Sequence, residues 1–156
     1  MNTPSASDSI ERSIHIRANR ARIWHVLTDA EQFGTWFGAD LAGQTFQPGQ
    51  RTRGRITVCG HEHAWFDVVI ETLQPQVLMA FRWHPYSVDP GFDYASETPT
   101  LVTFTLADGP DNGTVLQVIE SGFDKLPPHR RQQAFRMNSL GWDPQLNNLA
   151  RHATPA

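Results

Sequence analysis

The apolar residues near the C-terminal end predict a long helix over residues 130–152. Its stripe has steps of seven, four, three and four, which suit one face of an α-helix: Phe135, Trp142, Leu146, Leu149 and Ala153. Polar Asn138 or Ser139 occupies the turn between the first two members, and Gly141 follows. The buried face of an ordinary core helix is not expected to carry polar groups and a gap. The pattern therefore predicts a helix that covers a cavity.

The same segment predicts a kink or a break. Pro144 has no backbone N–H to donate within a helix, and Asp143-Pro144 is typical of an N-cap followed by proline at the first helical position. We therefore expect the last helix to be kinked near Gly141, or to consist of two pieces.

The N-terminal third predicts one strand and two short helices. Residues 10–17 alternate between apolar and polar side chains, as in a half-buried strand. Asn19 suits the N-cap of a helix over residues 20–27, and a second helix is expected over residues 30–36.

The middle of the chain predicts β-structure. Strands are expected over five further ranges: 51–58, 63–73, 77–84, 100–106 and 114–121. Asp111-Asn112-Gly113 is a strong hairpin turn, and residues 85–98 form a long loop of the kind that is often a functional lid or disordered. The fold class is α+β: a curved antiparallel sheet of about six or seven strands with the last helix along its concave side. We expect a flexible tail over residues 1–9 and a single domain over residues 10–153.

Composition and charge narrow the function. The chain has 156 residues and a net charge of −3, and it shows no basic patch of the kind that nucleic-acid binding needs. No apolar run approaches the roughly 20 residues of a membrane helix. The polar N-terminus lacks a secretion signal, and the single cysteine, Cys59, is compatible with a reducing cytosol. The expected location is cytoplasmic, with neither nucleic acid nor membrane as partner.

Glu120 is the first candidate for chemistry. It shares a strand face with Leu116 and Val118, so it is expected to point into the cavity, where a carboxylate could act as acid, base or ligand anchor. In the alternative interpretation Glu120 is solvated at the strand end or paired with an arginine such as Arg82.

Other polar candidates are weaker. Asn138 and Ser139 either offer hydrogen bonds to a ligand or satisfy backbone groups beside Gly141. Cys59, His61 and His63 include zinc-type ligands, but no second pair completes a tetrahedral set, so we interpret the cluster as structural or incidental. His25 and His84 are isolated and are interpreted as structural.

Aromatic side chains, 10% of the chain, supply walls for a core and for a ligand pocket alike. The predicted ligand-binding residues are Trp36, Phe37, Phe66, Phe81, Trp83, Phe104, Glu120, Asn138 and Trp142. No catalytic residue, metal ion or cofactor is predicted. Trp65 lies on the opposite strand phase from Phe66, so it is expected at the surface as a candidate contact in a homodimer.

Seven sequence pieces, in order along the chain, carry a family resemblance. They are ARIWHVLTDAEQFGTWFG (21–38), FQPG (46–49), ETLQP (71–75), FRW (81–83), VTFTL (102–106), GTVLQVIESGFD (113–124) and NSLGWDPQLNNL (138–149). The chain resembles the AHSA-like group (activator of heat-shock-protein ATPase homologues) of the START-like, birch-pollen-allergen-like superfamily, also called SRPBCC. The resemblance implies a helix-grip fold, in which a curved sheet grips the C-terminal helix around a cavity that binds apolar or amphipathic molecules in many members. It implies no particular reaction.

The residues and the resemblance leave three hypotheses for the function. The first is binding of a hydrophobic or amphipathic small molecule between sheet and helix. The second is an enzyme of the polyketide cyclase or dehydratase kind, with Glu120 or a histidine as acid or base. The third is a stress-related, co-chaperone-like interaction module; the eukaryotic co-chaperone of this group normally carries a second domain, which a chain of this length is not expected to contain.

Overall fold

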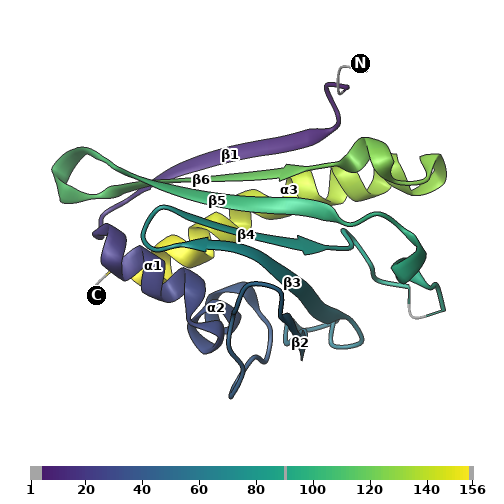
Figure 1. Cartoon of the computed structure of the whole chain (residues 1–156), viewed down its shortest axis with the longest axis horizontal. Coiled ribbons are helices and arrows are strands. Elements are labelled where there is room, and N and C mark those ends of the chain that lie inside the picture. The colour runs from purple at the N-terminus through teal and green to yellow at the C-terminus, as the bar shows by residue number, and fades with distance from the viewer. Residues whose placement is uncertain (1–4, 90, 155–156) are drawn as a thin grey trace.

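The structure is a computed structural model that describes residues 5–89 and 91–154. A single antiparallel sheet has the strand order β1-β6-β5-β4-β3-β2. The strands are β1 (Ser9–Ile16), β2 (Arg51–Arg55), β3 (Trp65–Gln74), β4 (Leu78–Trp83), β5 (Thr100–Asp108) and β6 (Thr114–Ser121). The helices are α1 (Arg20–Thr28), α2 (Ala30–Phe37) and α3 (Pro128–Ala153). Figure 1 shows α3 running behind the curved sheet, with α1 and α2 near its C-terminal half. The predicted α+β helix-grip fold is confirmed.

Alternation along the strands determines which side chains face α3. In β6, Thr114, Leu116, Val118 and Glu120 are buried, and the residues between them are only partly buried. In β5 the positions of Val102, Phe104 and Leu106 are buried in the same way. Glu120 therefore lies on the inner face, as its strand phase predicts.

Side-chain caps set the limits of the two short helices. Asn19 Oδ1 accepts a hydrogen bond from the Arg22 backbone N–H at 2.8 Å, which confirms the predicted N-cap of α1. Asp29 ends α1 and caps α2, because its Oδ1 accepts from the Gln32 N–H at 3.0 Å. Gly38 ends α2 in the left-handed conformation, with φ of 101°.

Helix α3 is continuous from Pro128 to Ala153, so of the two expectations for this segment the division into two pieces is wrong. A proline inside a helix leaves the carbonyl four residues earlier, that of Leu140, without its N–H partner. Leu140 is 63% exposed and Pro144, one turn later on the same side, is also exposed, so this side of the helix faces water. Water can satisfy the Leu140 carbonyl, and Asp143 caps no new helix.

The buried stripe of α3 also differs from the expected one in its first half. Phe135 is only partly buried, and Arg130 and Ala134 lie in the buried stripe instead. From Trp142 onward the stripe is as expected, with Leu146, Leu149 and Ala153 buried. The helix thus changes character along its length, from polar contacts at its start to apolar packing at its end.

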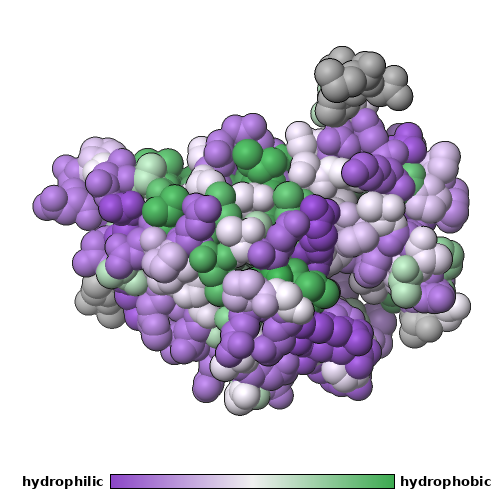
Figure 2. Space-filling model, viewed as in Figure 1, coloured by the Kyte–Doolittle hydropathy of each residue, from purple (hydrophilic) through white to green (hydrophobic). Residues whose placement is uncertain are grey.

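The outer face of the sheet carries a mixture of apolar and charged residues (Figure 2). Arg51, Arg53 and Arg55 alternate on the exposed side of β2. Trp65 and Val69, on β3, are 38% and 44% exposed on the same face. In the described part of the chain, no helix has both the length and the apolar character needed to span a membrane.

Candidate functional site

The carboxylate of Glu120 is fully buried beneath α3 and accepts hydrogen bonds from four side chains. Trp83 Nε1 and Thr100 Oγ1 donate to Oε2 at 2.7 and 2.6 Å. Trp142 Nε1 donates to Oε1 at 3.0 Å. Asn138 Nδ2 donates to Oε1 at 2.9 Å and to Oε2 at 3.1 Å. Strands β4, β5 and β6 and helix α3 therefore meet at one carboxylate.

The partners of Glu120 are uncharged. Among the described residues, no arginine, lysine or histidine hydrogen bonds to it or pairs with it. A buried charge is costly unless it is hydrogen-bonded, and indole and amide N–H groups are pure donors that suit a carboxylate. Arg82, its alternative partner in the sequence analysis, instead pairs with Glu71 at 3.4 Å on the outer face. The alternative of a solvated or Arg82-paired Glu120 is wrong.

Two hollows lie beside this network, between the sheet and α3. One, of about 230 Å³, is bounded by α2, the start of β3 and the loop after β4. The other, of about 200 Å³, lies under the middle of α3 and is lined by Phe37, Trp83, Asn138, Gly141, Trp142 and Gln145. Both hollows share Phe37, Trp83 and Asn138. We call the two together the inner pocket.

Five of the nine predicted ligand-binding residues line the inner pocket: Phe37, Phe66, Trp83, Asn138 and Trp142. The rings of Trp83 and Trp142 stack with centroids 5.9 Å apart. Glu120 itself does not line either hollow, because the side chains that bind it stand between it and the pocket.

Three predicted residues belong to the core. The Trp36 indole donates to the Val26 carbonyl at 2.9 Å, and Phe81 and Phe104 are fully buried. None of the three lines the inner pocket. Of the two polar residues at the gap in the stripe, Asn138 reaches Glu120, whereas the backbone carbonyl of Ser139 accepts a hydrogen bond from Arg12 at 3.4 Å.

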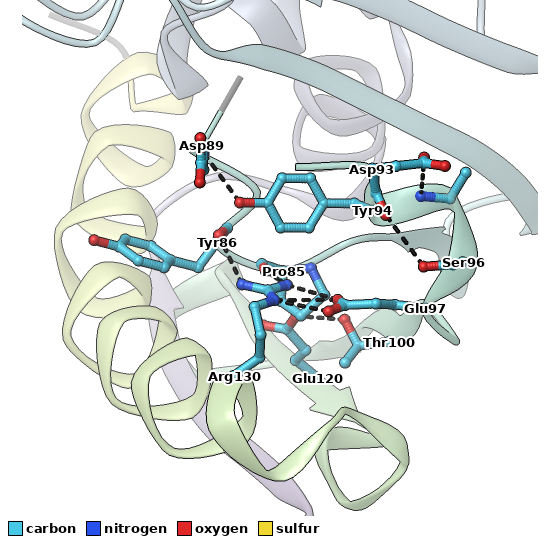
Figure 3. Close-up of polar contacts among 11 residues, drawn as sticks. Pro85, Tyr86, Asp89, Asp93, Tyr94, Ser96, Glu97, Thr100, Glu120 and Arg130 are labelled. Carbon is cyan, nitrogen blue, oxygen red and sulfur yellow. Dashed lines mark hydrogen bonds and ion pairs between the residues drawn. The ribbon is translucent and has the colours of Figure 1, made fainter. Parts of the chain in front are cut away.

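A second buried polar cluster surrounds Arg130, in the first turn of α3 (Figure 3). Its guanidinium pairs with Glu97, with Nη2 to Oε1 at 2.8 Å and Nε to Oε2 at 2.9 Å. It also donates to the carbonyls of Pro85 and Tyr86 at 2.8 and 3.0 Å, and it lies 4.6 Å from the centroid of the Tyr94 ring. Arg130 thereby fastens the loop between β4 and β5 to α3.

This cluster positions one wall of the inner pocket. Tyr86, Ser87 and Val88 line the larger hollow, and Arg130 bonds directly to the backbone of Tyr86. The length of the loop predicts a lid or a disordered segment, but no local signal in the sequence marks Arg130 as its anchor. An arginine near the start of a helix is usually solvated, and Glu97 is 33 residues away along the chain.

The candidate zinc ligands Cys59, His61 and His63 are not grouped as a metal site in the part of the chain that the structure describes. Cys59 is exposed, and the rings of His61 and His63 lie 6.5 Å apart. Within residues 5–89 and 91–154, no three His, Cys, Asp or Glu side chains are grouped to hold a metal ion. His84 lines the larger hollow, its Nδ1 is buried without a hydrogen-bond partner, and burial lowers the pKa of its ring.

A curved antiparallel sheet closed by a long C-terminal helix, with a hollow between them, defines a helix-grip protein of the SRPBCC type. The chain belongs to the family described as "Activator of Hsp90 ATPase homolog 1-like protein", whose sequence profile matches residues 17–154. No curated protein matches the chain.

Solved structures share this fold at low sequence identity. DynU16, a protein of the dynemicin biosynthetic locus, is 23% identical with a TM-score of 0.69; the match covers 96% of this chain and 47% of DynU16, so the chain spans about half of that protein. The Aha1 dimer from Colwellia psychrerythraea is 17% identical over 91% of this chain and 92% of that one, with a TM-score of 0.64. A protein from Arthrobacter aurescens is 15% identical over 99% and 91% of the two chains, with a TM-score of 0.76. These similarities establish the fold alone.

Proposed function

We propose that the protein binds a hydrophobic or amphipathic small molecule in the inner pocket, between the sheet and α3. One observation carries this proposal. The polar edges of three pocket-lining side chains, Trp83, Asn138 and Trp142, are already directed at Glu120. The surface that the two indoles leave to the pocket is carbon, which suits an apolar and preferably planar ligand.

The size of the inner pocket is consistent with such a ligand. Its two hollows measure about 230 and 200 Å³. Together they reach the lower part of the range of roughly 300–1,000 Å³ that is usual for small-molecule sites. Phe37 and Phe66 add further aromatic surface, and their ring centroids lie 6.0 and 6.2 Å from that of Trp83.

The contacts of Glu120 favour binding over catalysis. A general base needs a free lone pair within hydrogen-bond reach of the substrate. Both oxygens of Glu120 are occupied by protein donors, and the carboxylate lines neither hollow. We therefore assign Glu120 an architectural role: it holds the pocket walls in place.

A neutral fluorescent probe, N-phenyl-1-naphthylamine, tests the proposal by titration. Gly141 lines the hollow under α3, and a Cβ added there meets no atom within 4 Å. The Gly141→Leu variant should therefore fill part of this hollow without a clash. We expect the wild type to bind the probe and Gly141→Leu to bind it at least about fivefold more weakly, close to 1 kcal/mol. Gln133→Leu, which adds the same side chain at an exposed position of α3, is the control. No binding by the wild type, or equal affinities for all three proteins, would overturn the proposal.

A further inference from the structure

A larger hollow adjoins the inner pocket on the outer side of the sheet. It measures about 800 Å³ and lies between strands β2, β3 and β4 and the loop that follows β4. Seven residues line both this hollow and the larger hollow of the inner pocket: Ala64, Trp65, Asp67, Trp83, His84, Ser87 and Val88. We call the hollow the outer groove. The outer groove and the larger hollow of the inner pocket therefore adjoin along these shared residues.

The side of the outer groove formed by β2 is cationic. Arg51 and Arg53 line the outer groove. Arg55, which does not line it, points to the same face of β2, because strand side chains alternate with a period of two. Their cross-strand partners on β3 are Val69, Asp67 and Trp65, in that order. Figure 2 shows this face, where strongly hydrophilic residues border a band of hydrophobic ones.

The charges of this row do not cancel. Arg51 binds Asp67 through two hydrogen bonds of 2.8 and 2.6 Å, and Arg53 lies 3.5 Å from the same carboxylate. Arg55 donates to the Glu62 backbone carbonyl, which carries no charge. Arg51 and Arg53 therefore share one carboxylate, so this pair of lining arginines keeps a surplus of positive charge on a chain whose net charge is −3.

The ring of Trp65 holds two of these guanidinium groups in place. Arg53 and Arg55 lie 3.9 and 4.4 Å from its centroid, within the range of cation–π contacts. A guanidinium has five N–H donors and suits planar anions such as carboxylates. Trp65 also lines the inner pocket, so the cationic row and the apolar hollow meet at one side chain.

The opposite wall of the outer groove is different. Asp89 and Asp93 line it, and each accepts a backbone N–H of its own loop, from Gly91 and Ala95. An anion is therefore attracted to the β2 side of the groove. This asymmetry orients any charged ligand with its acidic end at the arginines and away from the loop.

We propose that the ligand is an amphipathic anion. Its acidic group, a carboxylate, sulfate or phosphate, binds the row Arg51, Arg53 and Arg55, and its apolar body passes Trp65 and His84 into the inner pocket. This inference rests on the proposed function, because it requires the inner pocket to hold the apolar body.

A matched pair of probes separates the two proposals. N-phenyl-1-naphthylamine and 1-anilinonaphthalene-8-sulfonate share one ring skeleton and differ by the sulfonate. We expect the wild type to bind the sulfonate probe at least about fivefold more tightly than the neutral probe. Added salt should weaken the binding of the sulfonate probe only, because exposed charges are screened over about 10 Å at 0.1 M. In Arg53→Gln/Arg55→Gln, which keeps the Arg51–Asp67 pair, the two affinities should become nearly equal.

Arg17→Gln/Arg20→Gln is the charge-matched control. It removes two positive charges beside the end of β1, the strand at the opposite edge of the sheet from β2. This variant should keep the wild-type ratio of the two affinities. Two results would show that the anion proposal is wrong while the proposed function stands; in both, the neutral probe binds the wild type. In the first, the ratio of the two affinities is near one in the wild type, and in the second, this ratio falls equally in both double variants. If the neutral probe does not bind the wild type, both proposals fall.

Discussion

Replacing Glu120 with glutamine tests the architectural role of its carboxylate. The structure places one indole N–H on each oxygen, that of Trp83 on Oε2 and that of Trp142 on Oε1. A glutamine amide offers one oxygen and one NH₂ group in the same space. Whichever way the amide is oriented, one buried indole N–H then faces another N–H donor.

The expected cost follows from this geometry. A buried donor without a partner costs about 1–3 kcal/mol, and the remaining bonds drop from the charged range of about 1.5–3 kcal/mol toward about 0.5–1.5 kcal/mol. Burial of a neutral amide is less costly than burial of a carboxylate, which offsets part of the loss. We expect Glu120→Gln to lower the free energy of unfolding by roughly 2–4 kcal/mol, which corresponds to a fall in Tm of about 5–15 °C for a chain of this size.

Urea unfolding and calorimetry measure this change. Glu71→Gln is the matched control, because Glu71 is a strand glutamate in a half-exposed pair with Arg82 and should change stability by less than about 1 kcal/mol. If the two variants are equally stable, the hydrogen bonds to Glu120 do not stabilise the fold as the structure indicates. A more stable Glu120→Gln would instead indicate that the carboxylate is kept for chemistry at the expense of stability.

Three further outcomes are expected from the structure. Arg130→Met leaves the Glu97 carboxylate buried without its partner, so it should cost about 3–5 kcal/mol in urea unfolding, whereas Arg130→Met/Glu97→Gln should recover much of that loss; additive losses in the cycle would contradict the pair. Gly141→Ala should raise the stability by about 0.5–1 kcal/mol, because glycine is unfavourable inside a helix and the site has room for a methyl group; a lower Tm would show that α3 needs glycine there. His84 has a pKa below 6.5 in the folded protein, because burial disfavours its charged form. The contribution of neutral His84 to the free energy of unfolding is therefore complete above pH 6.5 and is lost as the pH falls below that value. The free energy of unfolding of His84→Gln should accordingly decline less between pH 7 and 5 than that of the wild type.

Periodicity was sufficient to predict the fold and the direction of Glu120. Alternation places Leu116, Val118 and Glu120 on one face of β6, and this depends only on local geometry. The donors that surround Glu120 come from residues 18 to 37 positions away, such as Asn138 and Trp83, and no local pattern specifies such contacts. The inward aromatic positions were predictable as a class, but whether each fills the core or lines a hollow depends on packing between separate elements.

The two main departures at α3 have physical causes that lie outside the sequence pattern. Pro144 suggested a break because the helix loses one hydrogen bond there, but the orphaned carbonyl belongs to the exposed residue Leu140, where water can replace the bond. Arg130 was not predicted to be buried because a charged residue enters the interior only with partners. Those partners are supplied by a loop whose course follows from the tertiary structure.

The spacing of Asn138 and Trp142 fixes the register of α3 along the sheet. The two residues are one helical turn apart, and both donate to Glu120. If the helix slid by one turn in either direction, the pair at the carboxylate would become Ala134 with Asn138, or Trp142 with Leu146, and one donor would be replaced by a hydrocarbon. Apolar packing alone tolerates such a shift more readily, because one aliphatic side chain resembles another. The buried carboxylate therefore selects a single docked position of the helix, and with it a single shape of the inner pocket.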